Sequence, residues 1–217
     1  MKHTIILIDF DGTITQQDSN VIVSRHYGTP PSKAMYEKVH SGKIPIRESM
    51  GGGFTGVKLS EHEYTEFIRQ AVEIAPGFPE FFRQAESNNI PLAVVSGGYM
   101  NPIRIVLDRE GITPAAIYAN RLEFTPEGIK KQFYHQAPNC DKDYGPCGNC
   151  KASHVKHYKE QYDRVIFIGD GFTDRCGALH ADEVYAKDWL ADYCREHGLP
   201  FTEFNDFYDL MHILGDV

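Results

Sequence analysis

The sequence is short of positive charge, of cysteine and of long apolar segments, and each shortage argues against a class of protein. Its 217 residues carry 22 Lys+Arg against 30 Asp+Glu, a net charge of −8. A nucleic-acid partner is not expected, because binding phosphates needs clustered positive charge. No apolar run approaches the ~20 residues of a membrane span, and no small-residue cleavage site follows the N-terminus. The five cysteines form an odd set, which predicts a reducing, cytoplasmic location.

Short apolar runs alternate along the chain with helical patterns. Runs over residues 4–8, 91–95, 117–120, 164–168 and 183–186 are predicted strands, because continuous β-branched runs are typical of strands buried on both faces of a sheet. Helical spacing of apolar residues appears over 78–87 and 101–109. The alternation predicts an α/β fold with a doubly wound, mostly parallel sheet, whose ligands bind at the carboxyl ends of the strands.

Residues 16–76 interrupt this alternation, because they contain no convincing strand. Tyr64, Phe67 and Ile68 lie at helical spacing there. We therefore expect a small helical cap over 16–76, inserted after the first strand, and an α/β core made of 1–15 and 77–217. Within the cap, Arg47, Glu48 and the glycine-rich segment 51–58 are candidates for recognising the tail of a substrate. At the other end of the chain, the apolar spacing over 204–214 predicts a helix packed on the core.

Two of the predicted strands end in paired carboxylates. Asp9 and Asp11 follow the first strand, and Asp170 and Asp174 follow the strand at 164–168. Close carboxylates repel one another unless a cation compensates them, and hard oxygen ligands suit Mg²⁺. A different interpretation, that these residues cap helices, remains open for both pairs.

An anion site is predicted next to these carboxylates. Ser96, Gly97 and Gly98 follow the strand at 91–95, and a hydroxyl followed by two backbone N–H groups can hold a small anion. Lys151, at the start of a predicted helix, is the candidate cation for a phosphate. Taken alone, it is more often a solvated helix residue.

These motifs resemble those of the haloacid-dehalogenase superfamily of phosphohydrolases. Asp9-Phe10-Asp11-Gly12-Thr13 is similar to its first motif, and Ser96, Lys151 and Gly169-Asp170 with Asp174 to the other three, in the same order. The resemblance implies that Asp9 is the nucleophile that becomes an aspartyl-phosphate and that Asp11 is the general acid and base. It implies that Ser96, Gly97 and Lys151 hold the phosphoryl oxygens. Mg²⁺ would be held by Asp9, Asp170, the Asp11 backbone carbonyl and, directly or through water, Asp174.

A narrower resemblance comes from the cysteines before the third motif. Cys147-Gly148-Asn149-Cys150-Lys151, with Cys140 upstream, looks like the corresponding segment of the phosphatase family that acts on 2-hydroxy-3-keto-5-methylthiopentenyl-1-phosphate in methionine salvage. Phosphoethanolamine and phosphocholine phosphatases are similar there. The cysteines allow three interpretations: thiols that pack a loop, a disulfide such as Cys140–Cys147, or a zinc site completed by His135.

The expected function is therefore a Mg²⁺-dependent phosphomonoesterase acting on a small phosphorylated metabolite, as a monomer or homodimer. Alternative substrates are phosphoserine and phosphoethanolamine. A phosphotransferase would use the same aspartyl-phosphate with another acceptor. A non-catalytic protein on the same fold is disfavoured, because both Asp9 and Asp11 are present.

Overall fold

The computed structural model describes residues 3–28, 33–49, 54, 57–135 and 147–215. Its sheet has the strand order β4-β3-β2-β1-β5-β6-β7, and every pair of neighbouring strands is parallel except β3 and β4. The predicted α/β class with a mostly parallel sheet is confirmed. The strands are β1 (Thr4–Ile8), β2 (Leu92–Tyr99), β3 (Ala116–Thr125), β4 (Gly128–Gln132), β5 (Arg164–Gly169), β6 (Glu183–Ala186) and β7 (Thr202–Glu203).

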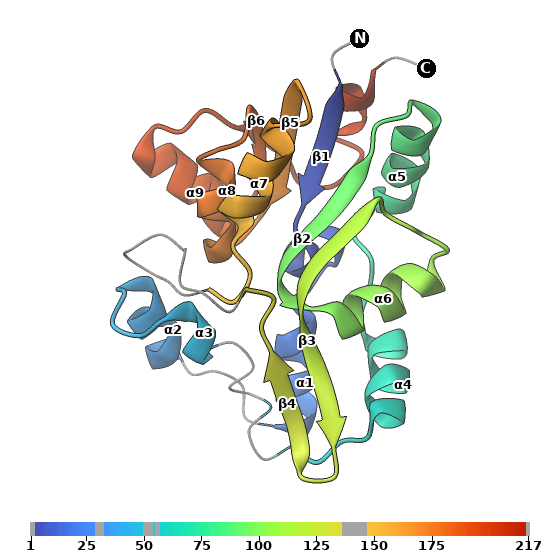
Figure 1. Ribbon diagram of the computed structural model, residues 1–217, viewed down its shortest axis with the longest axis vertical. Coiled ribbons are helices and arrows are strands. Elements are labelled where there is room, and N and C mark those ends of the chain that lie inside the picture. Colours follow the sequence, from blue (N-terminus) through green and yellow to red (C-terminus); the bar gives the residue numbers. More distant parts are fainter. Residues whose placement is uncertain (1–2, 29–32, 50–53, 55–56, 136–146, 216–217) are drawn as a thin grey trace.

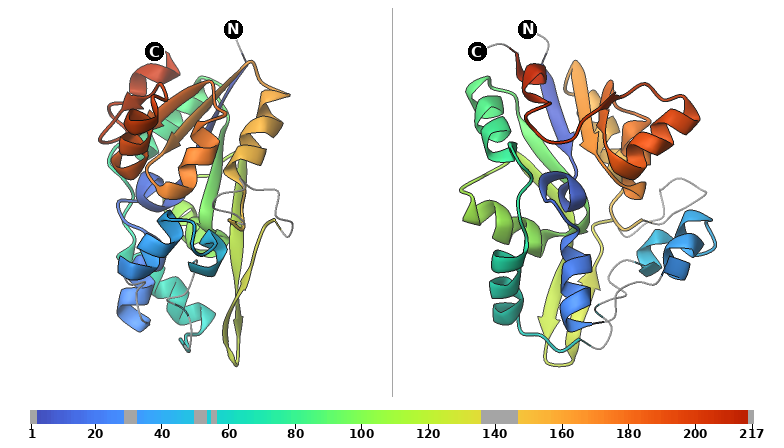
Figure 2. Two further views of the ribbon diagram at one scale, coloured as in Figure 1. Left: turned by 90° about the vertical axis from the view of Figure 1, so that its left-hand side faces the viewer. Right: turned by 180° about the vertical axis from the view of Figure 1, so that it is seen from behind.

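Helices surround the sheet and extend beyond one end of it (Figures 1 and 2). They are α1 (Ser19–Tyr27), α2 (Lys33–His40), α3 (Ile46–Ser49), α4 (Glu61–Ala71), α5 (Phe78–Ser87), α6 (Met100–Arg109), α7 (Lys151–Lys159), α8 (Arg175–Ala178) and α9 (Asp188–His197). None of the helices among the described residues is both long enough and apolar enough to cross a membrane.

The central strand β1 is buried on both faces, as its continuous apolar sequence predicts. Ile6 and Ile8 join the core cluster that includes residues of α5 and α6, whereas Ile5 and Leu7 join the cluster formed with α7, α8 and α9. This period-two division is what a strand between two helical layers requires. Because β1 lies between β2 and β5, Asp9 at its carboxyl end lies in the middle of the sheet.

The segment between β1 and α5 contains the helices α1 to α4 among its described residues. An isolated antiparallel bridge joins Thr15 to Ile74, next to the predicted boundaries of the cap. The spacing of Tyr64 and Ile68 correctly predicted a helix, since both are buried in α4. The division of the chain into a cap over 16–76 and a core over 1–15 and 77–217 stays a prediction.

The hairpin of β3 and β4 was not predicted. β3 continues beyond Asn120 to Thr125, and β4 returns antiparallel to it, so the hairpin reaches beyond the sheet beside α1 and α4 (Figure 1). The ring centroid of Phe124 lies 5.1 Å from that of Tyr64 in α4. The hairpin thus packs against helices of the inserted segment.

The predicted end of one strand and the predicted C-terminal helix were wrong. β2 does not end at Val95 but continues through Ser96, Gly97 and Gly98 to Tyr99. The predicted helix over 204–214 is replaced by turns and a short 3₁₀ helix, Met211–Leu214. The apolar residues of this segment nevertheless pack on the core, as their spacing predicted: Phe204, Phe207 and Leu210 are buried.

Candidate active site

The carboxyl ends of β1, β2 and β5, three neighbouring strands, bring the predicted site residues together. Asp9 directly follows β1 and its N–H donates to the carbonyl of Ile168 in β5 at 2.9 Å. Gly12 has φ +84°, and a Cβ there would lie 2.4 Å from Oδ2 of Asp170. Only glycine allows the turn after β1 to approach the turn after β5 this closely.

A cluster of three carboxylates forms the centre of the site. Asp9, Asp170 and Asp174 each offer an oxygen within 4.8 Å of the others, the one such set of potential metal ligands among the described residues. Burial, together with the charge of Asp174, raises the pKa of Asp9 to about 7. Burial and the charges of Asp9 and Asp174 also raise the pKa of Asp170. Crowded carboxylates of this kind fit a hard divalent cation, whose charge would compensate theirs.

Lys151 lies beneath the cluster and is the first residue of α7, as predicted. Its Nζ is 2.7 Å from Oδ1 of Asp9 and 2.5 Å from Oδ1 of Asp174, and its side chain is 1% exposed. The two carboxylates raise the pKa of Lys151 despite its burial, which by itself would lower it. The interpretation of Lys151 as a solvated helix residue is therefore wrong.

Asp174 orients the loop after β5. Its Oδ2 accepts hydrogen bonds from the N–H groups of Asp170 and Gly171 at 3.2 and 2.8 Å. With Oδ1 bound to Lys151, both oxygens of this fully buried carboxylate have partners. Asp174 thus both accepts the N–H groups of the loop and belongs to the three-carboxylate cluster.

The side chain of Asp11 points away from the three-carboxylate cluster. Its Oδ1 accepts from the N–H of Ser19 at 2.8 Å and its Oδ2 from Nδ2 of Asn20 at 3.3 Å. Burial and the charge of Asp18 hold the pKa of Asp11 well above its usual range. Participation of the Asp11 backbone carbonyl in a metal site stays a prediction.

The segment Ser96-Gly97-Gly98 lies opposite these acids, but not with two open N–H groups. The N–H of Gly98 donates to Oγ of Ser96 at 2.8 Å, so its donor is already used within the chain. The Ser96 hydroxyl hydrogen remains available to an anion because Oγ serves here as an acceptor. A Cβ at Gly98 would lie 2.3 Å from Oδ2 of Asp11, which explains why glycine occupies this position.

A cleft of about 460 Å³ opens over the site. It is lined by six of the eight predicted site residues: Asp9, Asp11, Ser96, Gly97, Gly98 and Asp170. The other two, Lys151 and Asp174, lie below its floor and contact Asp9 or each other. The structure thus brings all eight predicted site residues together. Their roles in catalysis and in binding phosphate and metal stay predictions.

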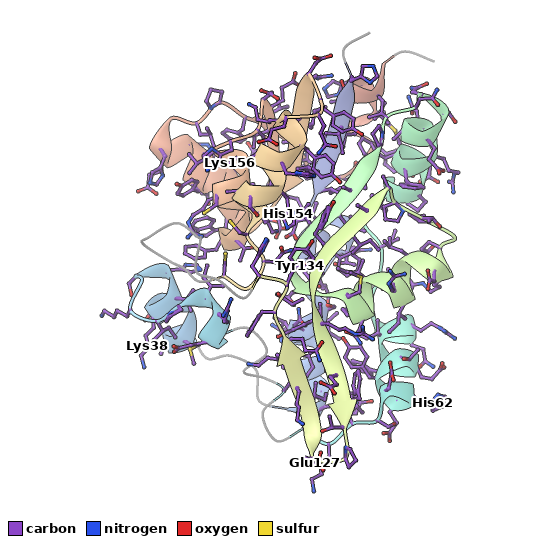
Figure 3. All side chains as sticks on the ribbon, in the orientation of Figure 1. Lys38, His62, Glu127, Tyr134, His154 and Lys156 are labelled. Carbon is purple, nitrogen blue, oxygen red and sulfur yellow. The ribbon has the colours of Figure 1, made fainter. Side chains whose placement is uncertain are left out.

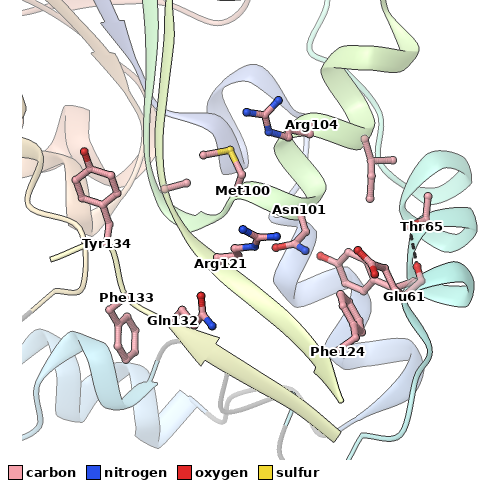
Figure 4. A pocket seen from close by; sticks show the side chains of 13 residues that line it. Glu61, Thr65, Met100, Asn101, Arg104, Arg121, Phe124, Gln132, Phe133 and Tyr134 are labelled. Atoms are coloured by element: carbon pink, nitrogen blue, oxygen red, sulfur yellow. Dashed lines mark hydrogen bonds between the residues drawn. The ribbon is translucent and has the colours of Figure 1, made fainter. Parts of the chain in front are cut away.

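A second cavity, of about 570 Å³, lies between α4, α6 and the β3–β4 hairpin (Figure 4). Its charged lining residues are Glu61, Arg104 and Arg121. None of the eight predicted site residues lines it, so the chemistry predicted from the motifs belongs to the cleft and not to the larger cavity.

Sequence reasoning missed Asn149, which anchors the segment before Lys151. Its buried amide donates to the carbonyls of Ser96 and Tyr118, both at 2.9 Å, and its Oδ1 lies 2.7 Å from Nε2 of His154. His154 and Tyr134 lie side by side here (Figure 3), with ring centroids 5.4 Å apart. The signal available in the sequence was a polar residue two positions before the motif lysine.

The structure narrows the interpretations of the cysteines. No disulfide joins any two of the four cysteines that the structure describes, and Cys140 lies outside the described residues. His135 accepts the N–H of Cys150 on Nδ1 at 3.0 Å, which fixes its ring without a metal. A disulfide between Cys140 and Cys147 and a zinc site that includes Cys140 stay predictions, because Cys140 lies outside the described residues.

The hypothesis that Arg47 meets the substrate is not supported by its contacts. Its Nη2 donates to the carbonyl of His135 at 2.6 Å and its guanidinium lies 4.5 Å from the ring centroid of Phe133. Neither Arg47 nor Glu48 lines the cleft. Of the glycine-rich segment 51–58, residues 51–53 and 55–56 lie outside the described residues, whereas Phe54 lines the cleft.

Comparison with known proteins agrees with this geometry. The family model described as Putative Phosphatase matches residues 4–190. A protein of Exiguobacterium sibiricum named 2-hydroxy-3-keto-5-methylthiopentenyl-1-phosphate phosphatase is 34% identical, over 95% of this chain and 94% of its own length. A protein of the same name from Geobacillus kaustophilus is 31% identical, over 98% and 96%.

Solved structures show the same fold at lower identity. A structure titled as a phospho-aspartyl intermediate analogue of phosphoserine phosphatase superposes with a TM-score of 0.74 at 17% identity, covering 98% of this chain and 99% of the other. Phosphoserine phosphatase from T. onnurineus gives a TM-score of 0.69 at 18% identity, covering 100% and 96%. The chain belongs to the phosphatase family that the matching model describes, and it is a phosphoric monoester hydrolase.

Proposed function

We propose that the protein is a Mg²⁺-dependent phosphatase that hydrolyses 2-hydroxy-3-keto-5-methylthiopentenyl-1-phosphate in methionine salvage. The names of its full-length relatives support this substrate. The structural observation that carries the assignment is the apolar lining of the cleft above the catalytic groups. Met35, Val39, Ile46 and Phe54 line it from the inserted segment.

This lining suits a neutral chain that ends in a thioether. Burial of a methylthio group against apolar side chains is favourable, at roughly 25 cal/mol per Å² of apolar surface. No lysine or arginine of the described residues between 16 and 76 lines the cleft, and the one described lysine that does, Lys187, directly follows β6 of the sheet. The inserted segment therefore offers apolar contacts but no lysine or arginine for the carboxylate of phosphoserine. The apolar lining therefore favours the methylthiopentenyl substrate over phosphoserine.

Asp9 is the nucleophile in the proposed mechanism. A carboxylate oxygen of Asp9 attacks phosphorus, the ester P–O bond breaks, and an aspartyl-phosphate forms. Lys151, 2.7 Å from Oδ1 of Asp9, orients the nucleophile and offsets charge close to the transferring group. Ser96, with the Gly97 N–H, would bind its oxygens from the other side of the cleft.

Asp11 is the general acid and then the general base. Burial and the neighbouring Asp18 raise its pKa, so the carboxyl can carry the proton that the leaving oxygen needs. After the first product departs, Asp11 removes a proton from the attacking water. Water then breaks the aspartyl–phosphate bond, which returns the Asp9 carboxylate and releases inorganic phosphate.

Mg²⁺ fits the carboxylates of Asp9, Asp170 and, directly or through water, Asp174. Its charge would neutralise the cluster and polarise the phosphoryl oxygens. The fit rests on the crowding of these buried acids. Burial and the neighbouring carboxylates raise the pKa values of Asp9 and Asp170. A cytoplasmic location and a monomeric or homodimeric state remain predictions from the sequence.

Phosphate release from a panel of phosphate esters tests the proposal. The panel contains the methylthiopentenyl phosphate, phosphoserine and phosphoethanolamine, each assayed with Mg²⁺ and with EDTA. We expect EDTA-sensitive turnover with the highest kcat/KM for the first substrate. Equal or faster turnover of either other ester would refute the substrate assignment, and phosphate transfer to added alcohols in place of water would indicate a phosphotransferase.

A pair of matched variants tests the nucleophile. Asp9→Asn should abolish turnover, because an amide is not nucleophilic toward phosphorus, while the circular-dichroism spectrum is retained. Asp192→Asn, an identical change at a carboxylate that is 79% exposed, should keep wild-type activity. Retained turnover in the Asp9 variant would remove Asp9 as the nucleophile.

A further inference from the structure

Two buried polar atoms without partners belong to residues that line the cleft near Asp11. The hydroxyl of Tyr99 and Oδ1 of Asn20 are buried and have no hydrogen-bond partner among the described residues, yet both residues line the cleft. Buried polar groups are normally paired, because an unpaired one loses its hydrogen bonds to water without a replacement. Neither the fold nor the mechanism above accounts for these two.

Both residues are positioned by elements that also position Asp11. Asn20 lies in the first turn of α1 and donates through Nδ2 to Oδ2 of Asp11 at 3.3 Å, which leaves Oδ1 as its unused acceptor. Tyr99 is the last residue of β2 and follows Gly98, whose Cβ position would lie 3.3 Å from Nδ2 of Asn20. Asn20 contacts Asp11 directly, and the Tyr99 hydroxyl is close enough to Asp11 for that charge to raise its pKa. Both unpaired groups therefore lie near the carboxyl that would protonate the leaving oxygen.

The hydroxyl of Tyr99 remains a donor at neutral pH. Burial and the charges of Asp18 and Asp11 raise the pKa of Tyr99 above its ordinary value, so the phenol stays protonated. The ring packs edge to face on Phe54, with centroids 6.1 Å apart, and the residue is 1% exposed. The hydroxyl is thus a fixed donor on a ring that is held by packing.

We propose that Tyr99 and Asn20 form a subsite for the two oxygens that follow the ester carbon of the substrate. Oδ1 of Asn20 accepts a hydrogen bond from the hydroxyl on the next carbon, and the Tyr99 hydroxyl donates to the neighbouring keto oxygen. One acceptor and one donor match a hydroxyl beside a ketone. The assignment of these oxygens to the methylthiopentenyl phosphate rests on the proposed function, but their chemistry is shared by any phosphate ester with a hydroxyl on the next carbon and a carbonyl beyond it.

The test variant is Tyr99→Phe, which keeps the ring and removes only the hydroxyl. The matched control is Tyr208→Phe, the same change at a tyrosine that is 58% exposed. Each protein is assayed with glyceraldehyde 3-phosphate, which carries a hydroxyl on the carbon next to the ester carbon and a carbonyl on the one after, and with propyl phosphate, which carries neither. The methylthiopentenyl phosphate is the third substrate.

We expect Tyr99→Phe to lower kcat/KM about 10-fold for the two oxygenated substrates, the scale of a lost hydrogen bond that leaves its partner unpaired. Turnover of propyl phosphate should change less than about 2-fold. The melting temperature should not fall, because the hydroxyl has no hydrogen-bond partner within the part of the chain that the structure describes. Tyr208→Phe should match the wild type throughout.

The two proposals fail in different ways. An equal loss on oxygenated and oxygen-free esters, or no loss on either, would overturn the subsite. A wild-type enzyme that does not prefer the methylthiopentenyl phosphate would overturn the proposed function. The comparison of glyceraldehyde 3-phosphate with propyl phosphate would still test the subsite in that case.

Discussion

Replacement of Lys151 by methionine is the sharpest test of how the buried charges are balanced. Methionine keeps much of the apolar length of the side chain and removes the ammonium group. Lys151 is 1% exposed and contacts Asp9 and Asp174, which are 8% and 0% exposed. After the change, three crowded carboxylates would remain without the cation that now pairs with two of them.

The magnitude follows from the burial of the ion pairs. Removing one partner of a buried ion pair costs about 3–5 kcal/mol, because the remaining charge stays desolvated. For a protein of this size, that corresponds to a loss of roughly 6–20 °C in melting temperature. The control, Lys159→Met, breaks a pair whose side chains are 40% and 34% exposed, and it should cost no more than about 1 kcal/mol.

The cost should depend on pH in a defined direction. The pKa of Asp9 is raised from 3.8 to about 7, so its protonated form is favoured in the folded protein. The stability associated with that proton is complete below the unfolded pKa of about 3.8 and is lost as the pH rises through about 7. Lys151→Met should therefore be most destabilising near pH 8 and less so near pH 5.5, where the carboxylates take up protons.

Urea unfolding at these two pH values, with EDTA and then with excess Mg²⁺, measures the effect. Added Mg²⁺ should restore part of the lost free energy of unfolding at pH 8, because it supplies positive charge to the same carboxylates. A cost below about 1 kcal/mol at both pH values, or one equal to that of Lys159→Met, would refute the reasoning. A cost that grows as the pH falls would refute its electrostatic basis.

Three further predictions follow from the site. Gly98→Ala should lower turnover at least about 100-fold with the fold retained, because a Cβ there lies 2.3 Å from Oδ2 of Asp11; circular dichroism and initial rates would show it, and wild-type rates would contradict the geometry. Asn149→Leu should lower the free energy of unfolding by at least about 2 kcal/mol, because it removes a buried donor to two backbone carbonyls; an unchanged urea midpoint would mean that those carbonyls find other donors. Metal-free wild-type protein should gain stability as the pH falls from 8 to 6, since the pKa of Asp9 is about 7, and thermal melting that moves in the opposite direction would contradict this.

The centre of the fold was predictable because its strands are short, continuous apolar runs. Such runs are buried on both faces only in a parallel sheet between helices, and the carboxylates that end two of them follow the strands directly. The location of Asp9, Asp170 and Lys151 could therefore be predicted from the order of the motifs. Their contacts could not, because a sequence does not show that one ammonium bridges two carboxylates.

The hairpin was missed because its pattern differs from that of the central strands. In β3, Leu122 is buried while Arg121 and Glu123 are exposed, the alternation of a half-exposed antiparallel strand. The prediction of a helix over 204–214 was wrong for another reason. Asp209 accepts hydrogen bonds from the backbone and side chain of Asn205, and local bonds of this kind compete with helix formation.

The unpaired atoms of Tyr99 and Asn20 were also out of reach of sequence reasoning. The sequence shows that a tyrosine follows Gly97 and Gly98, but it does not show whether the tyrosine hydroxyl has a hydrogen-bond partner. Only the three-dimensional arrangement shows that both polar atoms are buried and without partners. The spacing of apolar residues predicts which side chains are buried. Whether a buried polar atom has a hydrogen-bond partner depends on residues from distant parts of the sequence.

The position of β1 between β2 and β5 has a consequence for synthesis on the ribosome. β1, which precedes Asp9, is synthesised before both of its neighbours in the sheet, and β5 begins only at Arg164. Until then Asp9 cannot have both Lys151 and Asp170 beside it. A nascent chain that ends before Arg164 therefore lacks one of the two strands that flank β1, and the cluster of Asp9, Asp170 and Asp174 can form only after β5 and the turn behind it are made.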